Sequence, residues 1–102
     1  MANRKSKKRL RPVHPGEILG EEIETRGVTA GLVARDIDVP ANRISEIVAG
    51  RRNITPDTAF RLGLYFGTSA EFWLNLQAHH DLEMLAQIEG EAIKARVRPH
   101  AA

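Results

Sequence analysis

The sequence contains no cysteine, few aromatic residues (5%) and no long apolar run. Without cysteine there is no disulfide framework, no thiolate zinc site and no cysteine nucleophile. No apolar segment approaches the roughly 20 residues that span a membrane, and the basic N-terminus lacks the apolar core of a secretory signal. These absences fit a reducing compartment, and we expect a cytoplasmic protein without a membrane partner.

The chain is also short, which limits what it can build. With 102 residues and 42% hydrophobic residues, we expect one domain with a modest core and little room for an enzyme cleft. There is no glycine-rich phosphate loop and no serine in a nucleophile elbow. His79, His80 and Asp81 invite a metal interpretation, but adjacent helical residues diverge by about 100°, so one ion cannot easily take both imidazoles. We expect no enzyme activity, no metal and no cofactor.

The formal net charge of +2 hides an asymmetry along the chain. The first eleven residues carry six of the 15 basic side chains and no acid, which leaves nine basic against 13 acidic side chains elsewhere. A basic arm is suited to phosphate contacts, but a solubilising leader has the same composition, so both interpretations stay open. We expect a disordered basic arm over 1–12, a folded domain over 13–96 and a flexible tail over 97–102.

Capping residues and apolar spacing predict an all-α fold with five helices joined by short loops. No segment alternates as a strand would, and no repeat is present. Glycines 27, 50 and 67 and prolines 15, 40 and 56 mark several of the boundaries. The predicted helices are 15–26, 30–37, 40–49, 56–66 and an extended C-terminal helix from 70 to about 96.

The second and third predicted helices, with the three-residue connection 38–40 between them, have the arrangement of a helix-turn-helix. In the third helix Ile44, Ile47 and Val48 fall on one edge, and small or hydrogen-bonding side chains lie opposite. That pattern suits a helix in a DNA major groove. An ordinary surface helix has the same pattern, so the neighbouring segments must decide.

Several blocks of sequence, in order, resemble HigA/VapI-type antitoxins of the XRE (lambda-repressor-like) class. The blocks are 14–18 (HPGEI), 39–47 (VPANRISEI), 50–52 (GRR), 54–59 (ITPDTA) and 66–77 (FGTSAEFWLNLQ). The resemblance covers roughly residues 13–86. It implies a five-helix lambda-repressor-like domain that binds an operator palindrome in double-stranded DNA as a homodimer. It also implies repression of its own operon and neutralisation of a partner toxin, commonly a ribosome-dependent mRNA endonuclease of the RelE/HigB type.

On this interpretation the exposed side of the third helix reads bases. The amide of Asn42 matches adenine N6 and N7, and Arg43 suits guanine or a neighbouring phosphate. Glu46 either accepts from cytosine N4 or repels phosphate and so enforces the register. Ser45 suits a phosphate or a base edge, and Ala41 a thymine methyl group.

The expected phosphate contacts are Thr29, Arg51 and Arg52, although a solvated basic loop also explains the two arginines. Three departures from the class pattern weaken the case for DNA binding, and one of them is Gly31, a poor helix former inside the second helix. Ala30 stands where the class usually has a glutamine that contacts phosphate. Asp38 stands where it usually has a glycine, at a position that we expect to need a positive φ.

We expect the C-terminal helix to form the dimer interface through Leu82, Leu85 and Ile88, while Phe72 and Leu76 belong to the core. Such a dimer would read two half-sites about one DNA turn apart. Two alternatives stay open: a solitary XRE-family repressor without a toxin, and a protein-interaction adapter that has lost DNA binding.

Overall fold

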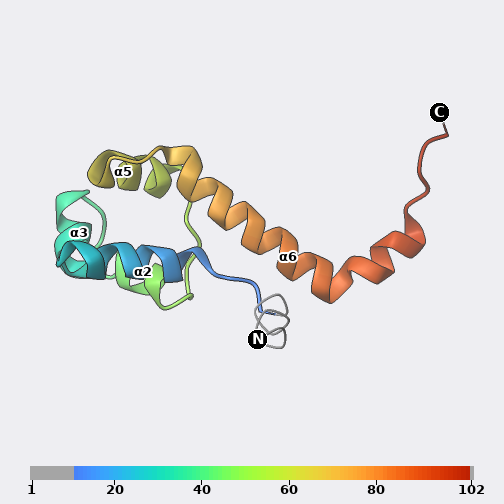
Figure 1. Cartoon of the computed structure of the whole chain (residues 1–102), viewed down its shortest axis with the longest axis horizontal. Coiled ribbons are helices and arrows are strands. Elements are labelled where there is room, and N and C mark those ends of the chain that lie inside the picture. The colour runs from blue at the N-terminus through green and yellow to red at the C-terminus, as the bar shows by residue number, and fades with distance from the viewer. Residues whose placement is uncertain (1–10, 102) are drawn as a thin grey trace.

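Five helices follow one another in the computed structural model, which describes residues 11–101 (Figure 1). They are α2 (Pro15–Arg26), α3 (Ala30–Asp36), α4 (Arg43–Val48), α5 (Pro56–Phe66) and α6 (Ala70–Arg96). No strand occurs between residues 11 and 101, so the all-α prediction is confirmed there. In the same part of the chain no helix combines the length and apolar character of a membrane crossing. Most of the predicted basic arm lies outside the described residues.

Local capping explains where most helices begin and end. The hydroxyl oxygens of Thr29, Thr55 and Ser69 accept hydrogen bonds from the first turns of α3, α5 and α6, which satisfies backbone donors that have no partner inside the helix. Gly27 and Gly67 follow α2 and α5 with φ of 69° and 77°, a left-handed conformation that glycine adopts without strain. The predicted bounds of α2, α5 and α6 are confirmed, whereas α3 ends at Asp36, one residue before its predicted end.

The predicted start of the third helix at Pro40 is wrong. The N–H of Arg43 donates to the carbonyl oxygen of Pro40 at 2.9 Å, which closes a turn before α4 begins. The connection between α3 and α4 therefore spans residues 37–42 rather than 38–40. Proline suits a turn as well as the first position of a helix, so its presence alone does not distinguish the two.

All five helices contribute to one core. Leu19, Val33, Ile44, Leu62 and Trp73 are among its buried side chains. Leu76 packs against this core as predicted. The core prediction for Phe72 is wrong, because its side chain is 42% exposed. Trp73 takes the inward direction, and adjacent helical residues point about 100° apart.

The first turn of α2 lies directly against the end of α4. A Cβ atom added to Gly16 would stand 1.8 Å from the carbonyl oxygen of Ile47. No side chain fits there without moving the backbone of α4, so this glycine permits the close approach of the two helices. This contact fixes the position of α4 against the helices that form the core, which we call the body of the protein.

His14 joins three segments at the same junction. Its Nδ1 accepts a hydrogen bond from the N–H of Gly16 at 2.9 Å, and the carboxylate of Glu17 accepts from the N–H of His14, which completes a capping box. The His14 ring also packs edge-on against His80 of α6, with centroids 4.9 Å apart. Partial burial, and next the charge of His80, lower the pKa of His14.

This pKa shift predicts a loss of stability in mild acid. The unfolded chain protonates His14 near its ordinary pKa of 6.5, whereas the folded chain does so only at lower pH. The contribution is complete above about pH 6.5 and declines as the pH falls from that value towards the lower folded pKa. Urea unfolding between pH 7.5 and pH 5 measures the decline.

Two variants test the source of this pH dependence. His14→Asn keeps a capping oxygen but cannot titrate, so its stability should fall less than that of the wild type over the same range. His100→Asn, in the C-terminal tail, should behave as the wild type. Identical pH profiles for His14→Asn and the wild type would show that another group is responsible.

Candidate nucleic-acid interface

The turn between α3 and α4 contains a strained residue. Asp38 has φ of 61° and is the one non-glycine residue with positive φ among residues 11–101, as expected from the sequence. The N–H groups of Asp38 and Val39 donate to the carbonyls of Arg35 and Ala34 at 3.2 and 3.0 Å. These bonds form the termination motif that usually carries glycine at the left-handed position. Asp38 thus performs the role of a glycine at a cost in backbone strain.

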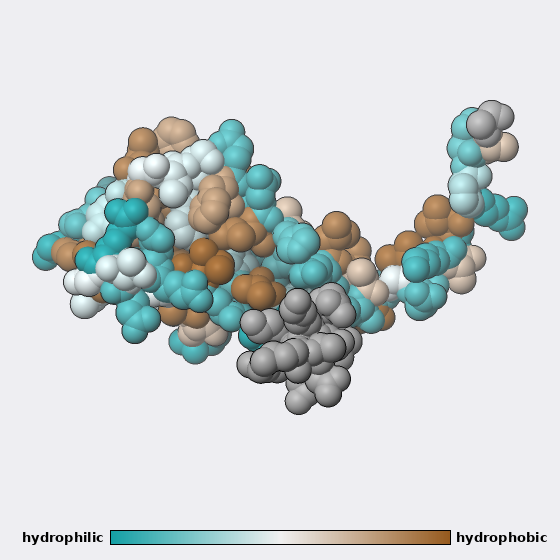
Figure 2. Space-filling view, in the orientation of Figure 1, coloured by the Kyte–Doolittle hydropathy of each residue, from teal (hydrophilic) through white to brown (hydrophobic). Residues whose placement is uncertain are grey.

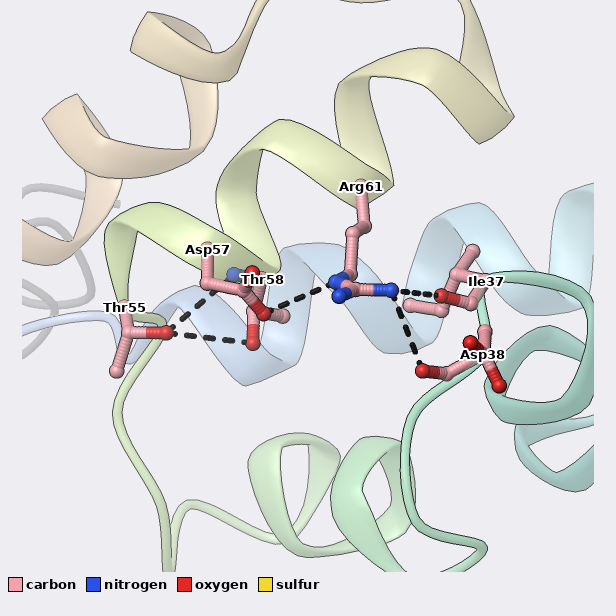
Figure 3. A network of polar contacts seen from close by, with 6 residues as sticks. All are labelled: Ile37, Asp38, Thr55, Asp57, Thr58 and Arg61. Carbon is pink, nitrogen blue, oxygen red and sulfur yellow. Dashed lines mark hydrogen bonds and ion pairs between the residues drawn. The ribbon is translucent and has the colours of Figure 1, made fainter.

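Arg61 of α5 donates hydrogen bonds to the backbone of this turn, as Figure 3 shows. Its Nη1 donates to the carbonyl oxygens of Ile37 at 2.7 Å and Asp38 at 3.2 Å. Its Nε donates to Asp57 at 2.9 Å, one helical turn earlier in α5. The Asp57–Arg61 spacing is visible in the sequence as an i,i+4 pair, but nothing in the sequence indicates the two carbonyls. Arg61 supports the turn of the candidate interface, and sequence reasoning missed it.

The exposed side of α4 brings the predicted base-reading residues onto one surface. Ala41, Asn42 and Ser45 are exposed, whereas Arg43 and Glu46 are half-buried. The hydroxyl of Ser45 donates to the backbone carbonyl of Asn42 at 3.1 Å. Asn42 precedes the helix without a side-chain capping bond, and its amide Nδ2 donates to Glu46 Oε2 at 3.0 Å. The expected side of the helix therefore faces outward, but two of its residues are bound to each other.

Near this surface, Arg43 and Arg51 differ from Arg52 in that their guanidinium groups are unpaired within the described part of the chain. The side chains of Arg43 and Arg51 make no hydrogen bond or ion pair with any other residue that the structure describes. The Nε of Arg43 is buried without a partner, while Arg51 is exposed. The buried Nε is out of reach of an outside acceptor, but the terminal nitrogens of Arg43 are unpaired among the described residues and available to one.

The predicted phosphate-binding residues lie on either side of α4 in sequence. They differ in which hydrogen bonds their side chains already make. The Thr29 hydroxyl oxygen accepts from Leu32 N–H at 3.1 Å, and its own proton stays available for donation. Gly50, with φ of 79°, turns the chain after α4 and leads into Arg51 and Arg52. Arg52 Nε donates to Glu46 Oε1 at 2.8 Å. Ala30, where the class has glutamine, packs against the core.

The predicted dimer residues lie where α6 leaves the body (Figure 1). Leu82, Leu85 and Ile88 are 65%, 43% and 71% exposed. Figure 2 shows apolar side chains along this part of the helix, which we call the α6 arm and define as residues 82–96. The described residues thus provide an apolar strip without a covering partner.

The histidines of α6 have separate partners. His79 Nε2 lies 3.5 Å from Glu83, and His80 Nδ1 lies 3.2 Å from Asp81. The two imidazoles therefore do not converge. Residues 11–101 hold no group of three or more His, Cys, Asp or Glu side chains able to bind a metal ion.

Comparison with known proteins agrees with this geometry. The helix-turn-helix family model matches residues 19–73, just over half of the chain. The chain belongs to the XRE-type helix-turn-helix family. This XRE-type chain is 46% identical over 82 residues to virulence-associated protein I of Dichelobacter nodosus, covering 79% of the chain and 76% of that protein.

Solved structures extend the likeness to antitoxins. A HigA-family addiction module antidote protein from Coxiella burnetii is 45% identical, with a TM-score of 0.84 over 88% of this chain and 99% of that one. The Pseudomonas aeruginosa antitoxin HigA, solved with the higBA promoter, is 39% identical, with a TM-score of 0.85 over 89% and 100%. The predicted resemblance to HigA-type antitoxins and the lambda-repressor-like fold are confirmed.

The strain at Asp38 predicts opposite effects for two small replacements. Asp38→Gly should raise the free energy of unfolding by up to about 1 kcal/mol, because glycine adopts positive φ freely and the Arg61 bonds go only to backbone oxygens. Asp38→Ala should lower it by about the same amount. Urea unfolding of the three proteins measures the order. Equal stabilities of the glycine and alanine variants would show that the turn is not strained.

Proposed function

We propose that this protein is a sequence-specific DNA-binding antitoxin that represses its own operon and neutralises a RelE/HigB-like mRNA endonuclease toxin. The main support is α4, whose hydrogen-bonding side faces outward while Gly16 and the Arg61 bonds hold the helix and its turn on the body. The likeness to a HigA antitoxin solved with promoter DNA also supports the proposal.

In the proposed complex α4 enters the major groove. Asn42 pairs with an adenine edge, Arg43 brings its unpaired guanidinium to a guanine or a phosphate, and Ser45 and Ala41 lie against neighbouring bases or the backbone. Thr29 and Arg51 donate to phosphates, from before α3 and after α4. Because position 30 lacks a glutamine, Thr29 and Arg51 would make a larger share of the contacts with the DNA phosphates.

We propose a homodimer that forms through the α6 arm. Leu82, Leu85 and Ile88 recur at three-residue intervals and therefore lie close together along the helix surface. Packing two such strips against each other removes their apolar area from water in both copies. The dimer then presents two copies of α4 to successive half-sites of a palindrome.

The toxin is the second proposed protein partner. The Coxiella burnetii relative is described as an addiction module antidote protein, which supports the same role here. We propose that the toxin binds away from the exposed side of α4, so that toxin and DNA do not compete for the same side chains. The product of an adjacent reading frame is the natural candidate for co-expression.

Removing the side chains of Asn42 and Arg43, which we propose to contact bases, tests the DNA-binding proposal. Asn42→Ala with Arg43→Ala should weaken binding to the palindrome upstream of the protein's own reading frame by roughly 30-fold or more, because two specific base contacts contribute about 1–3 kcal/mol each. Fluorescence anisotropy at several salt concentrations measures this loss. Wild-type affinity should fall steeply with salt, as expected for several phosphate contacts.

Control experiments distinguish a DNA-binding antitoxin from a protein-interaction adapter that has lost DNA binding. Asn75→Ala with Arg98→Ala removes the same residue types from exposed positions far along the chain and should leave DNA affinity nearly unchanged. The Asn42/Arg43 variant should still co-purify with the toxin. Capture of the toxin by a wild-type protein that binds scrambled DNA equally well would contradict repression and favour an adapter.

The dimer proposal predicts that charge on the α6 arm separates the two copies. Leu85→Glu with Ile88→Glu should halve the mass measured by light scattering and weaken operator binding by more than about 10-fold, because buried carboxylates are costly. Leu64→Glu is the control, since Leu64 is an apolar side chain on α5 that is at least as exposed as Leu85 and Ile88. A monomeric Leu64→Glu variant beside a dimeric arm variant would place the interface on α5 instead.

A further inference from the structure

Glu46 occupies the centre of the candidate interface, but its bonds point inward to the protein. We propose that Glu46 is a positioning residue, which orients Asn42 toward adenine and anchors Arg52 beside the DNA backbone, and that it does not itself contact a base. The proposal rests on the proposed DNA-binding function. It assigns the base preference of Asn42 to a neighbour one helical turn away.

Both carboxylate oxygens of Glu46 are already in use. Oε2 accepts from Asn42 Nδ2 at 3.0 Å, and Oε1 accepts from Arg52 Nε at 2.8 Å. The Glu46 side chain is only 28% exposed, against 45% for Arg52. A cytosine N4 group would have to displace a charge-assisted bond to reach either oxygen. The guanidinium of Arg52 also offsets the negative charge that would otherwise repel phosphates.

The bond to Glu46 decides which way the Asn42 amide faces. A carboxylate only accepts hydrogen bonds, so the amide nitrogen of Asn42 must face Glu46 and the amide oxygen must face away. One N–H and one carbonyl oxygen then remain free. These are the donor and the acceptor that the major-groove edge of adenine requires. Guanine presents two acceptors there, and an amide with one free N–H cannot satisfy both.

Glu46 also fixes the chain that follows α4. Its backbone carbonyl accepts from the N–H of Arg51 at 2.9 Å, across the turn at Gly50. Its carboxylate holds Arg52 through Nε alone, which leaves the two terminal nitrogens of that guanidinium for a phosphate. The same residue therefore sets the direction of Asn42 on one side and of Arg52 on the other.

Selection from randomised DNA duplexes, followed by affinity measurements on the selected site, tests this role. Asn42→Ala and Glu46→Ala should reduce the preference for adenine over guanine at the same operator position, each by roughly 5-fold or more. The double variant should show no further loss at that position, because both changes remove one unit. Glu24→Ala, which removes the same charge from an exposed site on α2, should leave the whole base profile unchanged.

Glu46→Gln separates the two functions of the side chain. Its amide oxygen still accepts from Asn42, so the adenine preference should persist. Its amide nitrogen faces the Arg52 donor, so the anchor is lost and the salt slope should fall by about one phosphate contact. Thermal melts verify that the variants are folded, which the high helix propensity of alanine and glutamine favours.

Other outcomes would contradict either the positioning role of Glu46 or the proposed DNA-binding function. If Glu46→Ala abolished a cytosine preference at a different position and kept the adenine preference, Glu46 would be a base-reading residue and the proposal would be overturned. If Glu46→Gln lost both effects or neither, the positioning role would also fail. A wild-type protein that selected no sequence would instead overturn the proposed DNA-binding function.

Discussion

The backbones of α2 and α4 approach closely where Gly16 meets the carbonyl of Ile47. The orientation of the exposed side of α4 depends on this contact. Six residues make too short a helix to be stable alone, so α4 takes its orientation from what it packs against. The first turn of α2 provides one surface, and the turn held by Arg61 provides the other. The candidate interface is therefore a property of the whole body rather than of one amphipathic segment.

The parts of the fold that local interactions determine were predictable from the sequence. Thr29, Thr55 and Ser69 cap helices through bonds that span three residues, and glycines end them, so a short window of sequence contains the whole cause. The start of α4 lay beyond this approach, because Pro40 fits a turn and a helix start equally well. The exposure of Phe72 depended on which of two adjacent aromatic side chains the core would accept, and that is a question of packing.

For the candidate interface, residue types and the outward side of the helix were predictable, but the partners of each side chain were not. The contact of His14 with His80, and the bonds of Arg61 to the turn, join segments far apart in the chain. Even the short-range triad of Asn42, Glu46 and Arg52 escaped prediction. Periodicity places side chains on a face but does not say whether they bind DNA or one another.

The length of α6 has a consequence for the geometry of recognition. The helix begins against the core and extends from Ala70 to Arg96 as one element, which changes direction within the arm (Figure 1). Each residue of such a helix advances its axis by about 1.5 Å. In a pair joined through the arms, the separation of the two α4 helices is set by where along α6 the copies cross. In the proposed dimer, operator spacing depends on the register of the last helix, and base preference depends on the chemistry of α4.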